Sequence, residues 1–245
     1  MEKIKLQKYF TDCGVLSRRA AEKEIAEGRV TVNGEIALLG DRVDPERDEV
    51  RYGGKIIKKQ TDESVCIMLN KPTGFVTTLS DEKGRPTVVS LTADLGIRVY
   101  PVGRLDLNSD GLLLLTNDGE LANRLTHPRH EIPKIYRVTV KGEVSADALR
   151  ALSSSMVIDG YKILPVKTEI MKKSTSGTVL RMELYEGRNR QIRKMCASVG
   201  LKILRLTRTA VGELTLGELP SGKWRRLTKS EIAYLKGEKQ GKATP

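Results

Sequence analysis

Residues 103–119 of this 245-residue chain read GRLDLNSDGLLLLTNDG. The four leucines at 112–115 form a short apolar run that predicts a buried strand. The polar residues before them favour a turn, and residues 99–105 in front of that turn also fit a strand. Asp106 therefore falls at a strand end beside Arg104, where functional side chains are often held. Aspartate is also common in ordinary turns, so this feature alone does not identify a site.

The chain beyond residue 64 combines many short strands with a few helices. Strand-like runs occupy residues 65–70, 134–140, 161–170, 178–187, 202–211 and 223–228, and residues 74–79 also fit a strand. Helical patterns occupy residues 87–96, 119–127, 145–155, 189–200 and 230–236. Short strands with brief connections predict a mainly antiparallel sheet, so we expect the α+β class.

The first sixty residues look like a separate small module. Ser17 is placed to cap a helix that Gly28 ends. Asn33-Gly34 between two short apolar runs predicts a tight hairpin. From this pattern alone, an RNA contact and an ordinary solvated surface explain equally well the arginines of the module, Arg18, Arg19 and Arg29.

A polar linker at residues 51–64 separates this module from the rest of the chain. We therefore expect one domain at 1–60 and a second at 61–236. The remaining residues, 237–245, have the composition of a disordered basic tail.

The charge of the chain points to a polyanionic partner. The formal net charge is +12, and residues 181–236 alone carry 13 basic and 5 acidic side chains. Such an excess favours nucleic acid over a membrane surface.

The aliphatic run at 112–115 is much shorter than the roughly 20 residues of a membrane span, and the N-terminus lacks the apolar segment of a signal peptide. Three widely spaced cysteines indicate reduced thiols in the cytoplasm.

Two stretches imitate ion- or phosphate-binding loops, and neither is complete. Residues 106–111 match the first half of a calcium loop, but Asn117 stands where a glutamate ligand is required. Residues 217–223 imitate a phosphate-binding loop, but Trp224 replaces the required Ser or Thr. We therefore expect no metal site.

Two further segments carry polar residues of interest. Residues 133–138 predict a strand with Tyr136 among basic residues. Residues 186–195, EGRNRQIRKM, head a helix whose spacing directs Ile192 and Met195 to the core. The basic residues of this helix do not share one stripe, so one arginine can face a carboxylate while others meet phosphate.

The N-terminal module resembles the RNA-binding domain first named in ribosomal protein S-four. The resemblance rests on Leu6-Gln7-Lys8, Gly14, Ser17-Arg18-Arg19-Ala20, Ile25, Gly28-Arg29-Val30 and Val32-Asn33-Gly34. It implies that the two helices and the hairpin turn grip the phosphates of folded RNA. The residues implied in this contact are Ser17, Arg18, Arg19, Arg29 and Asn33.

Across nearly its whole length the chain resembles the RsuA/RluB family of ribosomal RNA pseudouridine synthases. The motifs that carry the resemblance are GRLDxxxxGLLLLTNDG and EGRNRQIRKM. It implies a bacterial, cytoplasmic isomerase that needs no cofactor, and a catalytic domain with a central mixed, mostly antiparallel sheet. We expect a monomer. The second motif and residues 122–125 look closer to the RluB branch, which acts on large-subunit (23S) ribosomal RNA.

The resemblance also implies roles for single residues. Asp106 corresponds to the catalytic aspartate, and Arg193 to the arginine paired with it. Tyr136 corresponds to the tyrosine that stacks on the target base. Arg104 corresponds to the residue that fills the gap left by the flipped base, and Leu206 to an apolar residue under that base. Further RNA contacts are expected from Arg188, Asn189, Arg190 and Lys194.

Other functions remain open at this level. A small-subunit (16S) enzyme of the RsuA branch would share these motifs. A non-catalytic factor that binds ribosomal RNA during assembly could use the same scaffold, but it would not need Asp106. An enzyme acting on small nucleosides fits poorly with an added RNA-binding module and with the charge.

Overall fold

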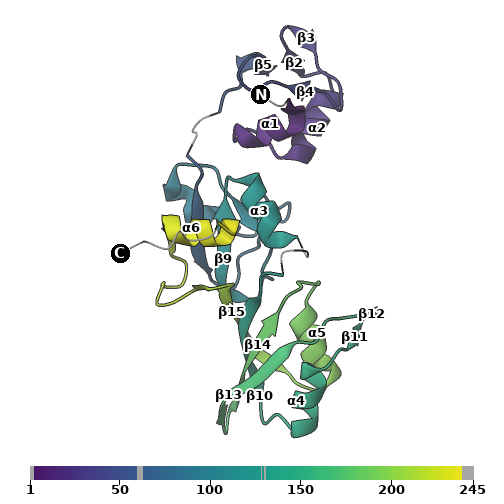
Figure 1. Ribbon diagram of the computed structural model, residues 1–245, viewed down its shortest axis with the longest axis vertical. Coiled ribbons are helices and arrows are strands. Elements are labelled where there is room, and N and C mark those ends of the chain that lie inside the picture. Colours follow the sequence, from purple (N-terminus) through teal and green to yellow (C-terminus); the bar gives the residue numbers. More distant parts are fainter. Residues whose placement is uncertain (1–2, 60–62, 128, 130, 239–245) are drawn as a thin grey trace. The chain divides into compact units, whose positions relative to one another are not determined.

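The computed structural model describes residues 3–59, 63–127, 129 and 131–238. The chain forms two compact units, Met1–Ser64 with Asn117–Gly119 and Val65–Thr116 with Glu120–Pro245 (Figure 1). The predicted boundary at residues 60 and 61 lies outside the described residues, as does the part of the predicted tail (237–245) that begins at residue 239. Gly237 caps the last helix. No described helix is long and apolar enough to span a bilayer.

The N-terminal unit packs two helices against short strands. Its helices are α1 (Leu6–Asp12) and α2 (Arg18–Ala26). Four strands pair in the order β3-β2-β5-β6, namely β2 (Val30–Val32), β3 (Glu35–Ile36), β5 (Val50–Tyr52) and β6 (Lys55–Ile56). Two more strands, β1 (Ile4–Lys5) and β4 (Arg42–Val43), pair with each other. Phe10 on α1 and Ile25 on α2 are buried against Val30 and Val50 of the sheet.

Local signals in the sequence of this unit are confirmed by the structure. Ser17 caps α2, because its hydroxyl accepts a hydrogen bond from the Ala20 amide at 3.2 Å. Asn33 and Gly34 have φ values of 53° and 90°, which the tight hairpin between β2 and β3 requires.

The larger unit is built on a nine-stranded sheet. Seven strands follow the order β13-β14-β10-β15-β9-β7-β17, with β16 beside β15 and β8 beside β9. Their bounds are β7 (Cys66–Lys71), β8 (Tyr100–Val102), β9 (Asp110–Thr116), β10 (Lys134–Lys141), β13 (Lys167–Ser174), β14 (Gly177–Leu184), β15 (Ile203–Val211), β16 (Leu214–Thr215) and β17 (Trp224–Arg226). The pairing of β9 with β15 is parallel, and the other pairings described for this sheet are antiparallel. The predicted α+β class with a mixed, mostly antiparallel sheet is therefore confirmed.

Helices cover this sheet in separate groups. The helices are α3 (Gly119–Thr126), α4 (Ala146–Ser153), α5 (Gln191–Ser198) and α6 (Lys229–Lys236), with a 3₁₀ helix at Val88–Leu95 and a small hairpin of β11 (Val157–Ile158) and β12 (Tyr161–Lys162). Side chains of α4 and α5 share a core with β10, β14 and β15. Side chains of α3 and α6 share a second core with β7 and β9, and the 3₁₀ helix contributes to a third.

The four leucines at 112–115 are explained by these cores. Leu112 and Leu114 belong to the core with α3 and α6, whereas Leu113 and Leu115 belong to the core with the 3₁₀ helix. Because successive side chains of a strand point to opposite faces, a strand covered on both faces reads as an unbroken apolar run.

Residues 74–79 do not form the predicted strand. Val76 makes an isolated bridge to Thr87. The Val76 amide donates to the Pro86 carbonyl at 2.9 Å, and the Val76 carbonyl accepts from the Val88 amide at 3.0 Å. The Gly74 amide donates to the Leu107 carbonyl at 2.8 Å and the Thr77 hydroxyl donates to the Leu105 carbonyl at 2.7 Å. The segment therefore also supports the loop of residues 103–109 before β9, which we call the Asp106 loop.

The cysteines of both units lie in the cores. Cys13, Cys66 and Cys196 are each buried. Burial raises the pKa of Cys13 and of Cys196 to about 11.

We expect Gly111→Ala to destabilise the larger unit severely. A Cβ at Gly111 would lie 2.2 Å from the Arg208 carbonyl oxygen, and its φ of +104° disfavours any side chain. The free energy of unfolding, measured by urea titration, should fall by about 3 kcal/mol or more because β9 and β15 must separate. Gly217→Ala is the matched control, since its φ is +56° but its Cβ would meet nothing within 4 Å, and it should cost about 1 kcal/mol. Equal losses in the two variants would contradict this account of the contact.

Candidate active site

Asp106 lies in the loop between β8 and β9. The Ser109 amide donates to the Asp106 carbonyl at 3.0 Å, which closes a turn directly before β9. The neighbouring carbonyls, of Leu105 and Leu107, accept hydrogen bonds from the 74–77 segment. The loop backbone is thus held on both sides of Asp106, while the carboxylate stays 29% exposed and accessible to a substrate.

Two arginines from the start of α5 converge on one oxygen of this carboxylate. Arg193 Nε lies 3.5 Å and Arg190 Nη1 lies 3.4 Å from Asp106 Oδ2. Arg193 also donates through Nη2 to the Asn108 carbonyl at 2.7 Å and to the Ser109 hydroxyl at 3.1 Å. The structure therefore brings Arg193 to Asp106, and it adds Arg190, which the sequence analysis assigned to RNA contact alone.

Lys71 supports the same loop from inside the protein. It is fully buried at the end of β7, and its Nζ donates to the carbonyls of Pro72, Asp106 and Ser109 at 2.9, 3.1 and 2.9 Å. Burial lowers the pKa of Lys71 to about 8, against the opposing attraction of the Asp110 and Asp106 carboxylates. Lys71 is not among the residues predicted from the sequence. The lysine that follows the apolar strand 65–70, directly before Pro72, was the available signal.

The first residues of β9 are held by buried polar contacts with β15. Asp110 accepts a hydrogen bond from Arg205 Nε at 2.8 Å, and its side chain is 10% exposed. Arg208 is buried and donates through Nε to the Leu112 carbonyl at 2.7 Å. Asp110 is therefore committed to structure, which leaves Asp106 as the accessible carboxylate of this loop.

Tyr136 and Leu206 lie on one face of the β10–β15 pair. Tyr136 on β10 is half-buried and contacts both the core of α5 and the core that contains Leu105. Leu206 on β15 is opposite Val138, two residues from Tyr136, and therefore shares its face. Tyr136 and Leu206 thus share a sheet face and both belong to the core that contains residues of α5.

The remaining predicted residues of this unit divide into exposed and engaged side chains. Arg104 and Asn189 are exposed, with no side-chain hydrogen bond or ion pair to the described residues. Arg188 lies over the ring of Tyr161 and beside Glu186. Lys194 is paired with Asp159. Arg188 and Lys194 thus tie α5 to the β11–β12 region.

The residues of the N-terminal unit that were predicted to contact RNA also divide into exposed and engaged side chains. Arg18 and Arg19 are exposed on α2 and free of ion pairs to the described residues. Arg29 is paired with Glu24 and Glu27, and these carboxylates raise its pKa. Asn33 is engaged within the unit, because its side chain donates to Asp48 and accepts from the Glu49 amide, both at 2.9 Å. The guanidinium groups of Arg18 and Arg19 are therefore more accessible to a ligand than the side chains of Arg29 and Asn33.

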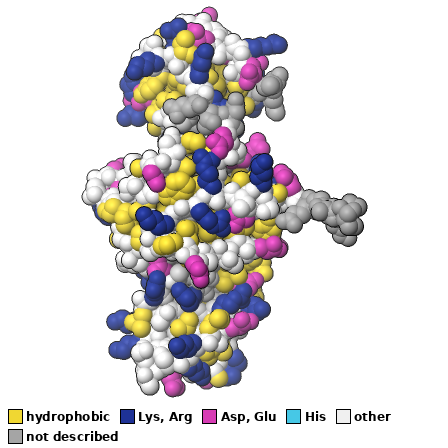
Figure 2. All heavy atoms as spheres, turned by 90° about the vertical axis from the view of Figure 1, so that its left-hand side faces the viewer, with side chains coloured by type: hydrophobic (Ala, Val, Ile, Leu, Met, Phe, Trp, Pro, Cys, Tyr) yellow, Lys and Arg dark blue, Asp and Glu magenta, His cyan; other side chains and the backbone are white. Residues whose placement is uncertain are grey.

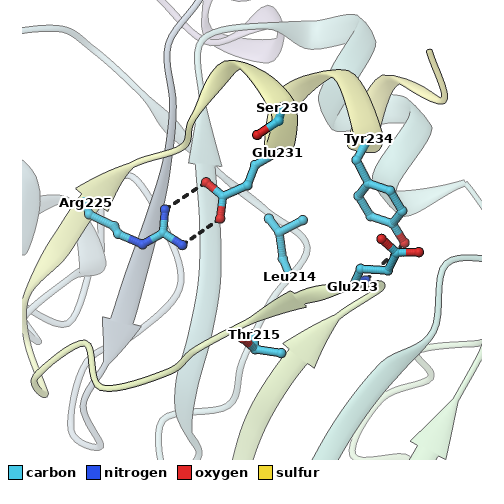
Figure 3. A pocket seen from close by; sticks show the side chains of 7 residues that line it. All are labelled: Glu213, Leu214, Thr215, Arg225, Ser230, Glu231 and Tyr234. Atoms are coloured by element: carbon cyan, nitrogen blue, oxygen red, sulfur yellow. Dashed lines mark hydrogen bonds and ion pairs between the residues drawn. The ribbon is translucent and has the colours of Figure 1, made fainter. Parts of the chain in front are cut away.

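A pocket of about 210 Å³ lies between β16, β17 and α6 and contains none of the predicted site residues (Figure 3). Arg225 donates to both carboxylate oxygens of Glu231 at 2.8 and 2.7 Å, and Glu231 also completes the capping box of α6. The Tyr234 hydroxyl accepts from the Glu213 amide at 3.0 Å. Because these polar groups form hydrogen bonds with one another, we interpret the pocket as a structural contact between α6 and the strands.

The surface and the ligand chemistry add two observations. On the face shown in Figure 2, Lys and Arg side chains are spread over both units and interspersed with Asp and Glu. Among the described residues no group of three His, Cys, Asp or Glu side chains is arranged to hold a metal ion. The arrangement around Asp106 is thus one accessible carboxylate with two guanidinium groups beside it.

Comparison with known proteins identifies the family of the chain. Residues 65–198 match the family model for RNA pseudouridylate synthase, and residues 14–50 match the S4 domain. The chain belongs to the RNA pseudouridine synthase family. Both resemblances stated from the sequence, to this enzyme family and to the S-four-type domain, are confirmed.

Relatives of this pseudouridine synthase match it over nearly their whole length. An RNA pseudouridine synthase of Aquifex aeolicus is 42% identical, over 96% of this chain and 94% of the relative. Ribosomal large subunit pseudouridine synthase B of Bacillus subtilis is 39% identical, over 95% of each chain. A crystal structure of a pseudouridylate synthase aligns with a TM-score of 0.67 and 32% identity, over 95% of this chain and 99% of that one.

We expect the contribution of Lys71 to the stability of this synthase to depend on pH. Its folded-state pKa of about 8 lies below the ordinary value of 10.5. Between these values the unfolded chain holds a proton that the folded chain has released, so raising the pH favours folding. The free energy of unfolding of wild type should therefore rise relative to Lys71→Met as the pH goes from 8 to 10.

Urea titrations of both proteins at several pH values measure this difference. Lys141→Met, at an exposed position at the end of β10, controls for the loss of one positive charge. Wild type and Lys71→Met curves that stay parallel from pH 8 to 10 would contradict the account.

Proposed function

We propose that this enzyme converts uridine to pseudouridine in large-subunit (23S) ribosomal RNA, with Asp106 as the catalytic carboxylate. The observation that carries the residue assignment is the convergence of Arg190 and Arg193 on this accessible carboxylate. The substrate is suggested by the Bacillus subtilis relative, whose name specifies the large ribosomal subunit.

The reaction breaks the bond from ribose C1′ to uracil N1 and forms a bond from C1′ to C5. C5 then loses its proton and N1 takes up a proton, so the product is an isomer of the substrate. The base is recaptured, so neither water nor a redox step is consumed, and the chemistry requires no cofactor or metal. One carboxylate suffices, either as nucleophile or as base and electrostatic support. A glycoside hydrolase, by contrast, uses two carboxylates because its leaving group must be protonated.

In this proposal Arg193 orients the carboxylate and offsets its charge when substrate excludes water. The three contacts of Arg193, to Asp106, Asn108 and Ser109, fix its guanidinium against the loop. An arginine held in this way can balance charge without moving during the reaction.

The target base must leave its stack to reach Asp106, at a cost of a few kcal/mol. The exposed Arg104 guanidinium is available to take the vacated position. Tyr136 would stack on the flipped uracil, and Leu206 on the same sheet face would pack beneath it. Arg188, Asn189 and Lys194 would bind the flanking backbone.

The N-terminal unit would add affinity through phosphate contacts at Arg18 and Arg19, with Ser17, Arg29 and Asn33 around them. Such contacts position the enzyme but carry little sequence information. We propose that the domains at 1–60 and 61–236 act together in one chain, as a monomer in the cytoplasm.

Replacing one of these arginines should change the salt dependence of RNA binding. Arg19→Gln should lower the slope of log K against log salt by about 0.7 to 0.9, the value for one phosphate contact. Arg51→Gln is the control, because Arg51 is exposed on β5 but already paired with Glu49. Filter binding to a ribosomal RNA fragment at several salt concentrations measures both slopes. Equal slopes for Arg19→Gln and wild type would remove Arg19 from the RNA contact.

The activity itself is tested by tritium release from RNA labelled at uridine C5. Wild type should release tritium from a large-subunit transcript or its precursor particle, and Asp106→Asn should release none because the carboxylate is lost. Asp147→Asn, an exposed carboxylate on α4, is the matched control and should behave as wild type. Both variants should bind RNA within about threefold of wild type, since neither replaced side chain is proposed to contact a phosphate.

The other outcomes decide between the alternatives. Release from a small-subunit transcript alone would keep the enzyme and replace the substrate with 16S ribosomal RNA, as in the RsuA branch. RNA binding without release from any transcript or precursor particle would favour a non-catalytic assembly factor.

A further inference from the structure

Arg190 and Arg193 reach the same oxygen of Asp106 but are held very differently. The Arg193 side chain is 17% exposed and has two more partners in the loop. The Arg190 side chain is 48% exposed, and among the described residues Asp106 is its one partner. The Arg193 side chain is therefore held by several contacts, whereas the Arg190 side chain is held by its ion pair with Asp106 alone among the described residues.

The backbone of Arg190 is fixed even though its side chain is not. Arg190 is the residue before α5 and adopts the left-handed conformation, with φ 53° and ψ 31°. Its carbonyl accepts the Lys194 amide at 3.0 Å, and its side chain does not cap the helix. Non-glycine residues in this conformation are strained and concentrate at functional sites. The strained backbone anchors the side chain at the edge of the site.

The ion pair of Arg190 with Asp106 is easily exchanged. Half-exposed pairs at this separation contribute little to stability because water competes with them. A phosphate offers a guanidinium two parallel hydrogen bonds, which is a stronger arrangement. A nucleotide whose C1′ faces Asp106 carries its phosphates on that same ribose, so a competing anion arrives within reach of Arg190.

We propose that Arg190 exchanges Asp106 for a phosphate next to the target uridine when RNA binds. Arg193 then remains as the cation beside Asp106. This inference rests on the proposed function, since it takes RNA as the substrate. Arg190 is in this view a positioning residue: the carboxylate is freed of its second cation by a correctly seated phosphate. A free nucleoside, which lacks phosphates, would leave that cation in place.

The test pairs a change in the protein with a change in the RNA. The shortest ribosomal RNA fragment that wild type modifies is made with a neutral methylphosphonate on the 5′ or the 3′ side of the target uridine. For wild type, one of these linkages should lower kcat/KM about tenfold, the scale of one charge-assisted hydrogen bond. For Arg190→Gln, kcat/KM on the unmodified fragment should fall similarly, and the neutral linkage should cause no further loss.

Two controls make the result specific. Arg150→Gln alters an arginine of α4 that is paired with Asp147 and has no contact with Asp106, and it should keep the sensitivity to the neutral linkage. Arg190→Lys keeps the charge and should restore part of that sensitivity, which also covers the case in which the Gln variant folds poorly.

If the neutral linkage lowers kcat/KM of Arg190→Gln by the same factor as that of wild type, the proposed exchange is wrong, because Arg190 and the phosphate then do not interact. No effect of either linkage on wild type would overturn it as well. Absence of tritium release by wild type from every unmodified ribosomal RNA would instead remove the proposed function and the exchange together.

Discussion

The parallel pairing of β9 with β15 is the constraint on which the catalytic unit depends. It consists of two residue pairs, Asp110 with Thr207 and Gly111 with Arg208. On one side of it lie β10, β13 and β14 with α4 and α5, and on the other lie β7, β8 and β17. The Asp106 loop ends where this pairing begins, and Arg193 comes from the opposite half. Carboxylate and guanidinium meet because the two half-sheets are joined at this point.

Joining the halves in this way buries several charged groups. Lys71 and Arg208 are almost wholly removed from water, and Asp110 is nearly so. Charges in such positions are tolerated when hydrogen bonds satisfy them. Here the acceptors for the two cations are mainly backbone carbonyls of the loop and of β9. The same hydrogen bonds that compensate for the buried charges also fix the backbone of the Asp106 loop.

Local chemistry made part of this structure predictable from the sequence. The hairpin at Asn33-Gly34 follows from a conformation that few residues accept, and the cap at Ser17 follows from unsatisfied amides. The run of four leucines reports a strand covered on both faces, which the structure shows. These signals need only neighbouring residues, so one sequence is enough to find them.

The long-range contacts of the site were not accessible in the same way. Helical spacing put the basic residues of α5 on different faces, so the assignment of Arg193 needed the family resemblance, and the contact of Arg190 with Asp106 went unnoticed. Lys71 was overlooked because a lysine at a strand end is normally solvated. Residues 74–79 have the composition of a strand, but their hydrogen bonds go to residues 86–88 and to the Asp106 loop, 28 residues away in sequence at Leu105.

The burial of the cysteines has a consequence for the chemistry of the folded enzyme. Thiolates, not thiols, react with oxidants and alkylating agents. With pKa values of about 11, Cys13 and Cys196 remain protonated at neutral pH, and like Cys66 they are shielded by the cores. The side chains assigned to the reaction include no sulfur atom. Base modification by this chain should therefore continue under oxidative stress that inactivates thiol-dependent enzymes.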